Sequence, residues 1–152
     1  REVTAVDTST EALMLARKNA AYNGMDACCQ FIEGNIFDQL RVYNKKQDQF
    51  DLIILDPPAF TREKSNLTGA VRGYKDINLR AVRLLSPGGY LVTCSCSYHM
   101  TDDLFRDVVL DAACDADRTV RVAEFRTQAP DHPVLLAAPE THYLKCLVIQ
   151  VM

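Results

Sequence analysis

The sequence predicts an α/β domain built on a mostly parallel sheet, with an antiparallel addition at its C-terminal end. Strand-sized apolar runs alternate with segments of helical periodicity from Val3 to about Asp117, an alternation typical of parallel strands joined by crossover helices. Two strands then follow one another over 119–125 and 143–152 without a helix between them. Such a succession indicates an antiparallel pair.

Composition limits the class of protein. The chain has 152 residues, 48% of them hydrophobic and 24% charged, with a net charge of −3, which fits one globular domain and argues against a generally basic nucleic-acid coat. No apolar run approaches the roughly 20 residues that span a bilayer. The six cysteines lack the spacing of a disulfide scaffold or a zinc site, so we expect a cytoplasmic protein without a membrane anchor or bound metal.

The first strand, Val3–Asp7, begins without a preceding cap or turn, and we expect it to belong to a fold that starts upstream. Thr8 and Glu11 have the spacing of a capping box, and Gly24 closes the predicted helix. A carboxylate on the last residue of a strand can accept two hydroxyl hydrogen bonds from a ribose. Asp7 is therefore a candidate cofactor ligand, with helix initiation as the alternative.

A short strand from Cys29 to Glu33 comes next, and after a brief helix the apolar run 50–55 follows. Its nearly continuous apolarity predicts a central parallel strand covered on both faces. It ends abruptly at Asp56. Ligands of open α/β sheets bind outside the carboxyl ends of the strands, so this carboxylate is a candidate site residue.

The segment 61–73 is predicted to be a long loop, and loops of that length are usually functional. Residues 60–83 contain six basic and two acidic side chains. A helix is expected from about Tyr74 to Leu85, ending at Ser86-Pro87-Gly88-Gly89. The side chains expected to contact phosphate are those of the loop, namely Arg62, Lys64, Arg72 and Lys75.

The strand that starts at Tyr90 ends in Thr93-Cys94-Ser95-Cys96-Ser97. A buried strand has no packing reason to end in a thiol between hydroxyls, whereas a strand that delivers a nucleophile to the sheet edge does. Cys96 is the candidate nucleophile, in one crevice with Asp56. Cys94 lies two residues earlier on the same face and is expected in the core, and the other four cysteines are expected to fill small apolar spaces.

Five segments carry a family resemblance: Asp56–Phe60, Arg72–Asn78, Ser95–Ser97, Asp131–Val134 and Tyr143–Lys145. Their order and spacing resemble the Rossmann-like class I methyltransferases that depend on S-adenosylmethionine. Within that group they are similar to the bacterial 23S ribosomal RNA (cytosine-5)-methyltransferases, and the match covers the chain from Val3.

The resemblance implies a role for each matching residue. Asp7 would hold the cofactor ribose, Asn35 and Ile36 the adenine, and Asp56 would lie between the amino-acid end of the cofactor and the target base. Cys96 would add to carbon 6 of cytosine, which makes carbon 5 nucleophilic enough to attack the methyl group. Ribosomal RNA would be the substrate, and the oligomeric state is left open between monomer and homodimer. The residues implied in substrate binding are Pro57, Pro58, Phe60, Arg72 and Lys75.

The chain departs from the family pattern in two places. Many RNA cytosine-5 methyltransferases have a second cysteine at the position of Ala59, so the base that removes the carbon-5 proton is unassigned, with His99 and His132 as candidates by residue type only. The glycine-rich cofactor loop and its strand would precede Val3. In the family order 3-2-1-4-5-7-6 that strand lies between the strands ending at Asp7 and Asp56. We therefore expect residues 1–152 to be a partial catalytic domain, inactive alone and without the family's RNA-binding domain.

Two other functions fit parts of the sequence. The turn Asp56–Phe60 is similar to the turn of amino-group methyltransferases, in which an aromatic ring stacks on the flipped base; such an enzyme has no use for Cys96. A chain without the glycine-rich loop could also be a non-catalytic RNA-binding remnant.

Overall fold

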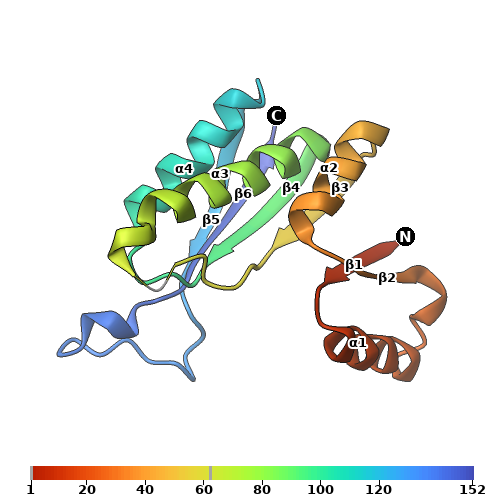
Figure 1. Ribbon diagram of the computed structural model, residues 1–152, viewed down its shortest axis with the longest axis horizontal. Coiled ribbons are helices and arrows are strands. Elements are labelled where there is room, and N and C mark those ends of the chain that lie inside the picture. Colours follow the sequence, from red (N-terminus) through yellow and green to blue (C-terminus); the bar gives the residue numbers. More distant parts are fainter. Residues whose placement is uncertain (1, 62) are drawn as a thin grey trace. The chain divides into compact units, whose positions relative to one another are not determined.

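The computed structural model describes residues 2–61 and 63–152, and the chain divides into two compact units, Arg1–Lys46 and Gln47–Met152 (Figure 1). Arg62, one of the predicted phosphate contacts, lies outside the described residues, as does the side chain of Lys64. Unit 1 contains β1 (Val3–Asp7), α1 (Thr10–Tyr22), η1 (Asp26–Cys28), β2 (Cys29–Glu33) and α2 (Ile36–Lys46). Unit 2 contains β3 (Phe50–Leu55), η2 (Lys64–Asn66), α3 (Leu67–Leu84), β4 (Leu85–Ser95), α4 (Asp102–Asp115), β5 (Val120–Arg126), η3 (Pro139–Thr141) and β6 (Lys145–Val151).

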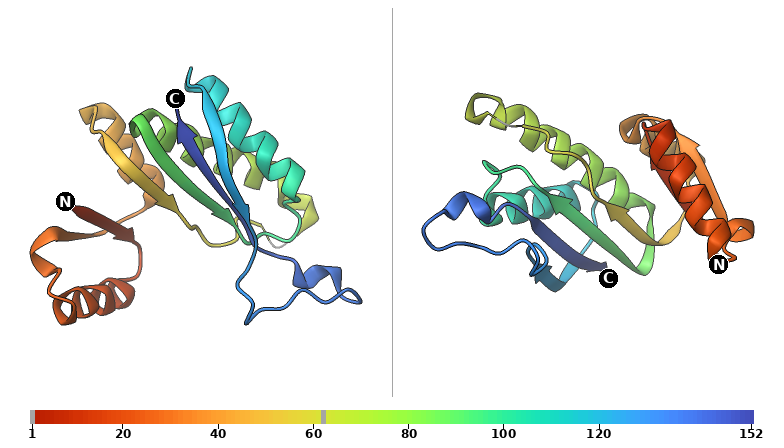
Figure 2. Two further views of the ribbon diagram at one scale, coloured as in Figure 1. Left: turned by 180° about the vertical axis from the view of Figure 1, so that it is seen from behind. Right: turned by 90° about the horizontal axis from the view of Figure 1, so that it is seen from below.

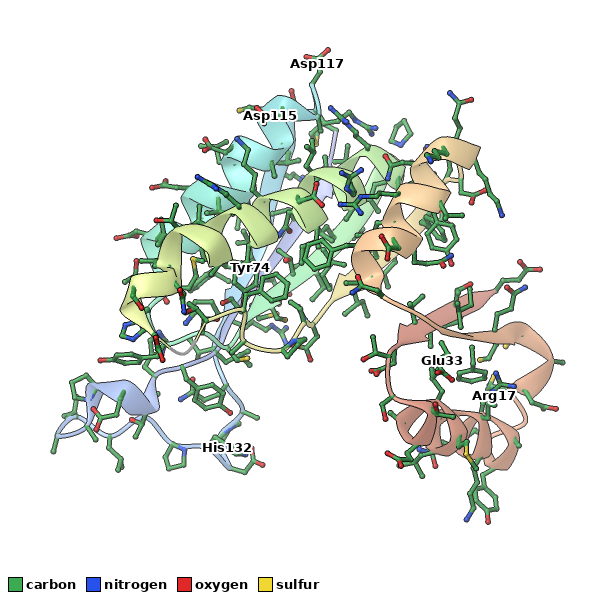
Figure 3. All side chains as sticks on the ribbon, in the orientation of Figure 1. Arg17, Glu33, Tyr74, Asp115, Asp117 and His132 are labelled. Carbon is green, nitrogen blue, oxygen red and sulfur yellow. The ribbon has the colours of Figure 1, made fainter. Side chains whose placement is uncertain are left out.

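Unit 1 is a β-α-β unit followed by α2. β1 and β2 pair in parallel, from Val3 opposite Cys29 to Asp7 opposite Glu33. The guanidinium of Arg17, on α1, donates a hydrogen bond of 3.1 Å to the Phe31 carbonyl and lies 5.4 Å from the centre of the Phe31 ring (Figure 3). This contact packs α1 against β2.

The helix α1 starts one residue later than the capping box predicted. Its N-cap is Ser9, whose hydroxyl accepts a hydrogen bond of 3.1 Å from the backbone N–H of Ala12. The backbone N–H of Ser9 in turn donates to the Asp7 carboxylate at 2.7 Å. Because this bond fixes the turn after β1, Ser9 rather than Thr8 is in position to cap the helix.

Unit 2 is a four-stranded sheet in the order β3-β4-β6-β5. β3 and β4 are parallel, while β6 runs antiparallel to both β4 and β5, so the predicted antiparallel C-terminal addition is confirmed. The helices α3 and α4 cover the same face of this sheet (Figures 1 and 2). The largest fully buried apolar side chains of the unit include Tyr74, Ile77, Leu84, Leu91, Met100, Phe105 and Ile149.

The prediction that β3 is a central, doubly covered strand is wrong. β3 is an edge strand of the four-stranded sheet, because its hydrogen-bonded neighbour there is β4 alone. Leu52 and Ile54, two residues apart on one face, are 53% and 63% exposed. The described strands form two separate sheets, β1-β2 and β3-β4-β6-β5. In the family order given above, the strand expected upstream of Val3 would come between β1 and β3.

The Pro-Gly-Gly turn predicted before β4 lies inside the strand. β4 begins at Leu85, which pairs with Phe50, and the register shifts before the next pair, Leu52 with Tyr90. Such a shift is a β-bulge. Gly88 has a φ of +82°, and a Cβ on Gly89 would lie 2.8 Å from the Ser86 carbonyl oxygen. Both positions therefore need glycine.

The prediction of a loop over residues 61–73 is also wrong for most of its length. η2 and α3 replace it from residue 64 onward, and Ala70, in the first turns of α3, is buried. Glycines at 69 and 73 weaken the helical pattern, but burial of Ala70 overrides that local preference. Arg72 and Lys75 therefore lie on a helix rather than a loop.

Candidate active site

Asp56 and Cys96 follow two neighbouring strands of unit 2. Asp56 comes directly after β3 and Cys96 directly after β4, and these parallel strands are in register at Leu55 and Thr93. Both side chains therefore lie at the carboxyl edge of the sheet, as predicted. The Asp56 residue is exposed, and Cys96 is partly buried.

Hydrogen bonds hold the turn that carries Cys96. The backbone N–H of Ser97 donates to the Ser95 hydroxyl at 3.4 Å, and the Ser97 hydroxyl lies 3.2 Å from the phenol oxygen of Tyr74. The Ser97 carbonyl accepts a bond of 2.8 Å from the ammonium nitrogen of Lys145. Ser95, Ser97, Tyr74 and Lys145 are all buried. The position of Cys96 is thus fixed from both α3 and β6.

Tyr74 connects this turn to the one after β3. Its ring lies 4.4 Å from that of Phe60, centre to centre, and 5.7 Å from that of Phe105 in an edge-to-face arrangement. Tyr74 is 0% exposed and projects from α3 (Figure 3). The Asp56–Phe60 turn and the Cys96 turn therefore pack on a common aromatic side chain.

Cys94 is a core thiol, as predicted. It lies opposite Cys146 in the β4–β6 register. Burial raises the pKa of the Cys94 thiol to about 12, helped by a hydrogen bond with Cys146 and by the negative charges of Cys146, Asp56 and Cys96. The charges of Asp56 and Cys96 are thus close enough to act on one buried group. Cys114 is exposed, so the prediction that it fills apolar space is wrong.

A cavity of about 620 Å³ adjoins the Cys96 turn. Its lining includes Tyr98, His99, Asp102, His142 and Lys145. The His142 Nε2 atom lies 3.2 Å from Asp102 Oδ1 and 3.3 Å from Oδ2. The lining combines the carboxylates of Asp102 and Asp103, the imidazoles of His99 and His142 and the buried amine of Lys145, whereas Cys96 and Asp56 are not among the lining residues.

Lys145 was not predicted as a site residue. It shares the buried face of β6 with Leu147, Ile149 and Val151 and is 2% exposed. Its Nζ atom donates to the carbonyls of Ser97 and Tyr143 at 2.8 Å each. Burial lowers the pKa of the Lys145 ammonium, while the charges of Asp102 and then Cys96 act in the opposite direction. A lysine within an otherwise apolar strand was the available sequence signal.

The histidines divide between the cavity and the surface. His99 lines the cavity, and so does His142, which the sequence did not single out. His132 lies in the excursion between β5 and β6 (Figure 3), with 62% of its side chain exposed and its ring edge-on to Tyr143 at 6.2 Å. Of the two predicted base candidates, only His99 lines this cavity.

Asp7 and Asn35 lie together in unit 1, at the carboxyl ends of β1 and β2. The Gly34 N–H donates to the Asp7 carbonyl at 2.9 Å, and the Asn35 side chain accepts from the Phe37 N–H at 2.8 Å, next to Ile36 at the start of α2. Both polar residues are exposed. A carboxylate and a polar backbone edge in this arrangement fit the ribose hydroxyls and the adenine of S-adenosylmethionine.

The predicted substrate-binding residues occupy different surroundings. Pro57, Pro58 and Phe60 lie in the turn after β3, at the edge that carries Asp56. Arg72 is exposed on α3. The Lys75 ammonium forms ion pairs with Asp115 at 3.0 Å and Asp111 at 3.9 Å, which raise its pKa through a hydrogen bond to Asp115 against the opposing effect of burial. A role of Arg72 and Lys75 in RNA binding stays a prediction.

The described residues lack two other kinds of feature. No group of three or more His, Cys, Asp or Glu side chains among them could hold a metal ion. Over residues 2–61 and 63–152, every helix is too short or too polar to cross a membrane.

Residues 1–134 match the family model described as a methyltransferase domain. The chain belongs to this methyltransferase family. Membership confirms the predicted Rossmann-like fold and the predicted cofactor, S-adenosylmethionine.

Curated relatives of this methyltransferase domain include ribosomal RNA large subunit methyltransferase I of Klebsiella pneumoniae, 50% identical over 153 residues and 100% of the chain. The protein of the same name from Aeromonas hydrophila is 50% identical over 151 residues, 99% of the chain. The chain spans 38% of the length of either relative. Among solved structures, that of SMU.776, a methyltransferase in complex with SAH, superimposes with a TM-score of 0.83 at 22% identity, covering 99% of this chain and 39% of that one.

Proposed function

We propose that residues 1–152 form part of the catalytic domain of a cytoplasmic enzyme that methylates carbon 5 of a cytosine in large-subunit ribosomal RNA. The observation that carries this proposal is the thiol of Cys96, held at the carboxyl edge of the sheet beside Asp56. The name of the curated relatives, at 50% identity over the whole chain, supports ribosomal RNA as the substrate. RNA methylation through an amino group would leave this fixed thiol without a role.

The cofactor would contribute an electrophilic methyl group, with Asp7 holding its ribose and Asn35 and Ile36 its adenine. Cys96 adds to carbon 6 of the cytosine, which turns the ring into an enamine that is nucleophilic at carbon 5. Asp56 stabilises the protonated ring nitrogen or the exocyclic amine as the adduct forms. The buried bonds from Tyr74 and Lys145 to Ser97 keep the thiol in place, and such positioning is itself a catalytic contribution.

The packing of Phe60 bears on the competing amino-group mechanism. That mechanism needs the aromatic residue of the turn to stack on the flipped base. The Phe60 ring instead lies 4.4 Å from Tyr74 at an interplanar angle of 32°, so one of its faces is already covered. In an amino-group enzyme the flipped base would therefore have to stack on the opposite face of the Phe60 ring.

Covalent trapping tests the proposal. The full-length protein is incubated with S-adenosylmethionine and ribosomal RNA that contains 5-fluorocytosine, in which fluorine blocks the loss of the carbon-5 substituent. We expect a protein–RNA adduct that peptide mapping places at Cys96 and that Cys96→Ala abolishes. Cys114→Ala, at an exposed position on α4, is the matched control and should form the adduct normally.

Two results would contradict the proposal in different ways. Methyl transfer to ordinary RNA without any adduct on the fluorinated RNA would favour an amino-group methyltransferase. Failure of the full-length protein to bind S-adenosylmethionine would favour the non-catalytic remnant.

A further inference from the structure

The cytosine-5 reaction needs a proton acceptor that the sequence leaves unassigned. After methyl transfer, carbon 5 carries both the new methyl group and its original hydrogen, and the product is released only when that proton leaves. Ala59, in the turn after β3, has no titratable group. A titratable side chain that borders the Cys96 turn is placed to accept this proton.

We propose that the amine of Lys145 removes the carbon-5 proton and so releases Cys96 from the methylated base. This inference rests on the cytosine-5 reaction proposed above. Among the titratable side chains that line the cavity, Lys145 is the one bonded directly to the turn that carries Cys96, through the Ser97 carbonyl at 2.8 Å.

The geometry of the Lys145 nitrogen suits a base. The Nζ atom donates one hydrogen bond to the Ser97 carbonyl and one to the Tyr143 carbonyl, both at 2.8 Å. A neutral amine has two N–H groups and one lone pair. In the neutral form both N–H groups would be taken up by these carbonyls and the lone pair would occupy the remaining position, and Lys145 is one of the residues that line the cavity.

The surroundings favour the neutral amine more than those of an exposed lysine do. Lys145 is 2% exposed and lies on the buried face of β6, next in that face to Leu147. Burial penalises the charged form and lowers the pKa of this ammonium, with Asp102 and Cys96 acting in the opposite direction.

The electrons and atoms balance without any further reactant. The Cys96 sulfur forms a bond to carbon 6, carbon 5 takes the methyl group, and the bond between that methyl and the sulfonium sulfur breaks. The carbon-5 proton then passes to Lys145 Nζ, its bonding electrons restore the double bond between carbons 5 and 6, and the sulfur leaves carbon 6 as a thiolate. The Lys145 ammonium returns its proton to water through the cavity, past His142 and Asp102.

The test measures whether the adduct accumulates on ordinary RNA. The full-length Lys145→Met protein is incubated with methyl-labelled S-adenosylmethionine and unmodified ribosomal RNA. Loss of a general base slows the step by about 10²- to 10⁴-fold, so we expect a labelled protein–RNA adduct, stable to denaturation, where the wild type leaves little. Lys45→Met, at an exposed position in the last turn of α2, is the matched control and should not accumulate the adduct.

A structural role of Lys145 predicts the opposite result. If the lysine only positions the Ser97 turn, its removal misplaces Cys96 and both adduct and product decrease together. Lys145→Arg covers the case in which the methionine variant does not fold, because arginine donates hydrogen bonds but does not accept a proton at neutral pH. We expect this variant also to accumulate adduct, and the double variant Cys96→Ala/Lys145→Met to form none.

Three further outcomes separate the explanations. Normal turnover by Lys145→Met overturns the assignment, and accumulation of adduct by His99→Gln or His142→Gln instead would transfer the role to that histidine. Formation of 5-methylcytosine by the wild type, with no adduct in either Lys145 variant, defeats this inference alone. Absence of 5-methylcytosine from the wild-type reaction defeats the proposed function as well.

Discussion

Unit 1 and unit 2 carry candidate site residues at equivalent places in their sheets but differ greatly in how much core supports them. In the described part of unit 1, Leu13 and Leu40 are the buried apolar side chains, while Val3, Met14 and Met25 are more than half exposed. Unit 2 contains the other buried apolar side chains of the described chain, most of them on α3, α4, β4 and β6. The cofactor candidates Asp7 and Asn35 thus belong to unit 1, which has few buried apolar side chains. The candidate nucleophile belongs to unit 2, which has many.

The difference shows what each kind of residue needs from its surroundings. Asp7 and Asn35 are exposed and are oriented by local backbone bonds within the turns after β1 and β2, which short segments can supply. Cys96 is oriented by Tyr74 and Lys145, distant in sequence and fully buried. A nucleophile that must meet a reacting atom depends on such a rigid core.

The largest difference between the two units is expected in the rate at which their cysteines react with a thiol reagent. Because the pKa of Cys94 rises from its ordinary 9.0 to about 12, the thiolate fraction at pH 8 falls by roughly 10³-fold. We expect iodoacetamide to label Cys94 roughly that much more slowly than a thiol in an unfolded peptide, and the half-buried Cys28 of unit 1 to react before Cys94. Mass spectrometry of the native protein measures both rates. Equal labelling of Cys28 and Cys94 would mean that unit 2 opens as readily as unit 1.

Removing a core ring from unit 2 should have the next largest effect. Phe105 is 0% exposed and packs edge-to-face on Tyr74, so Phe105→Ala should lower the free energy of unfolding by about 3–5 kcal/mol. Met14→Ala in unit 1, where the side chain is 65% exposed, should change it by less than about 0.5 kcal/mol. Chemical denaturation gives both values. Similar losses for the two variants would show that Met14 is covered in solution.

The bulge in β4 offers a backbone test within unit 2. Gly89→Ala places a Cβ 2.8 Å from the Ser86 carbonyl oxygen and should destabilise by about 1–3 kcal/mol, because surrounding backbone must move. Gly69→Ala is the matched control in α3, where a Cβ meets nothing within 4 Å, and it should stabilise by up to about 1 kcal/mol. Thermal unfolding measures the two shifts. A stabilising Gly89→Ala would contradict the close approach of position 89 to the Ser86 carbonyl oxygen within β4.

Helix caps give the smallest effect and show whether the units unfold together. Ser9 caps α1 in unit 1 and Thr101 caps α4 in unit 2, each accepting a bond from a backbone N–H. Replacing either by alanine should cost about 1 kcal/mol. If the units unfold separately, Ser9→Ala shifts only an early helical transition in circular dichroism and Thr101→Ala only the main one. A shift of one common transition by both variants would show a single cooperative unit.

Much of the fold and part of the site followed from local patterns. The strand ends at Asp7, Asp56 and Cys96 were visible because a polar residue ends each apolar run, and the antiparallel C-terminal pair was visible because no helix separates its strands. The early start of α3 could not be predicted from the sequence, because the glycines at 69 and 73 weaken the helical pattern. Burial of Ala70 in the folded protein stabilises the helix there.

The residues that contact the Cys96 turn or line the nearby cavity could not be predicted from the sequence, for a different reason. From sequence alone a lysine is predicted to be exposed, because burial of its charge without partners costs free energy. The partners of Lys145 are backbone carbonyls at residues 97 and 143, and sequence carries no information about which carbonyls a fold brings near. The same holds for His142 and Asp102, which are 40 residues apart.

The stack of Phe60 on Tyr74, together with the bond from Tyr74 to Ser97, has an evolutionary consequence. Three segments of the chain depend on the size and polarity of one ring, so a smaller residue at position 74 removes the contacts that it makes with both Phe60 and Ser97. We expect the three positions to have diverged as a set among descendants of a common ancestor. Transplanting any one of them between distant homologues should fail where moving all three succeeds.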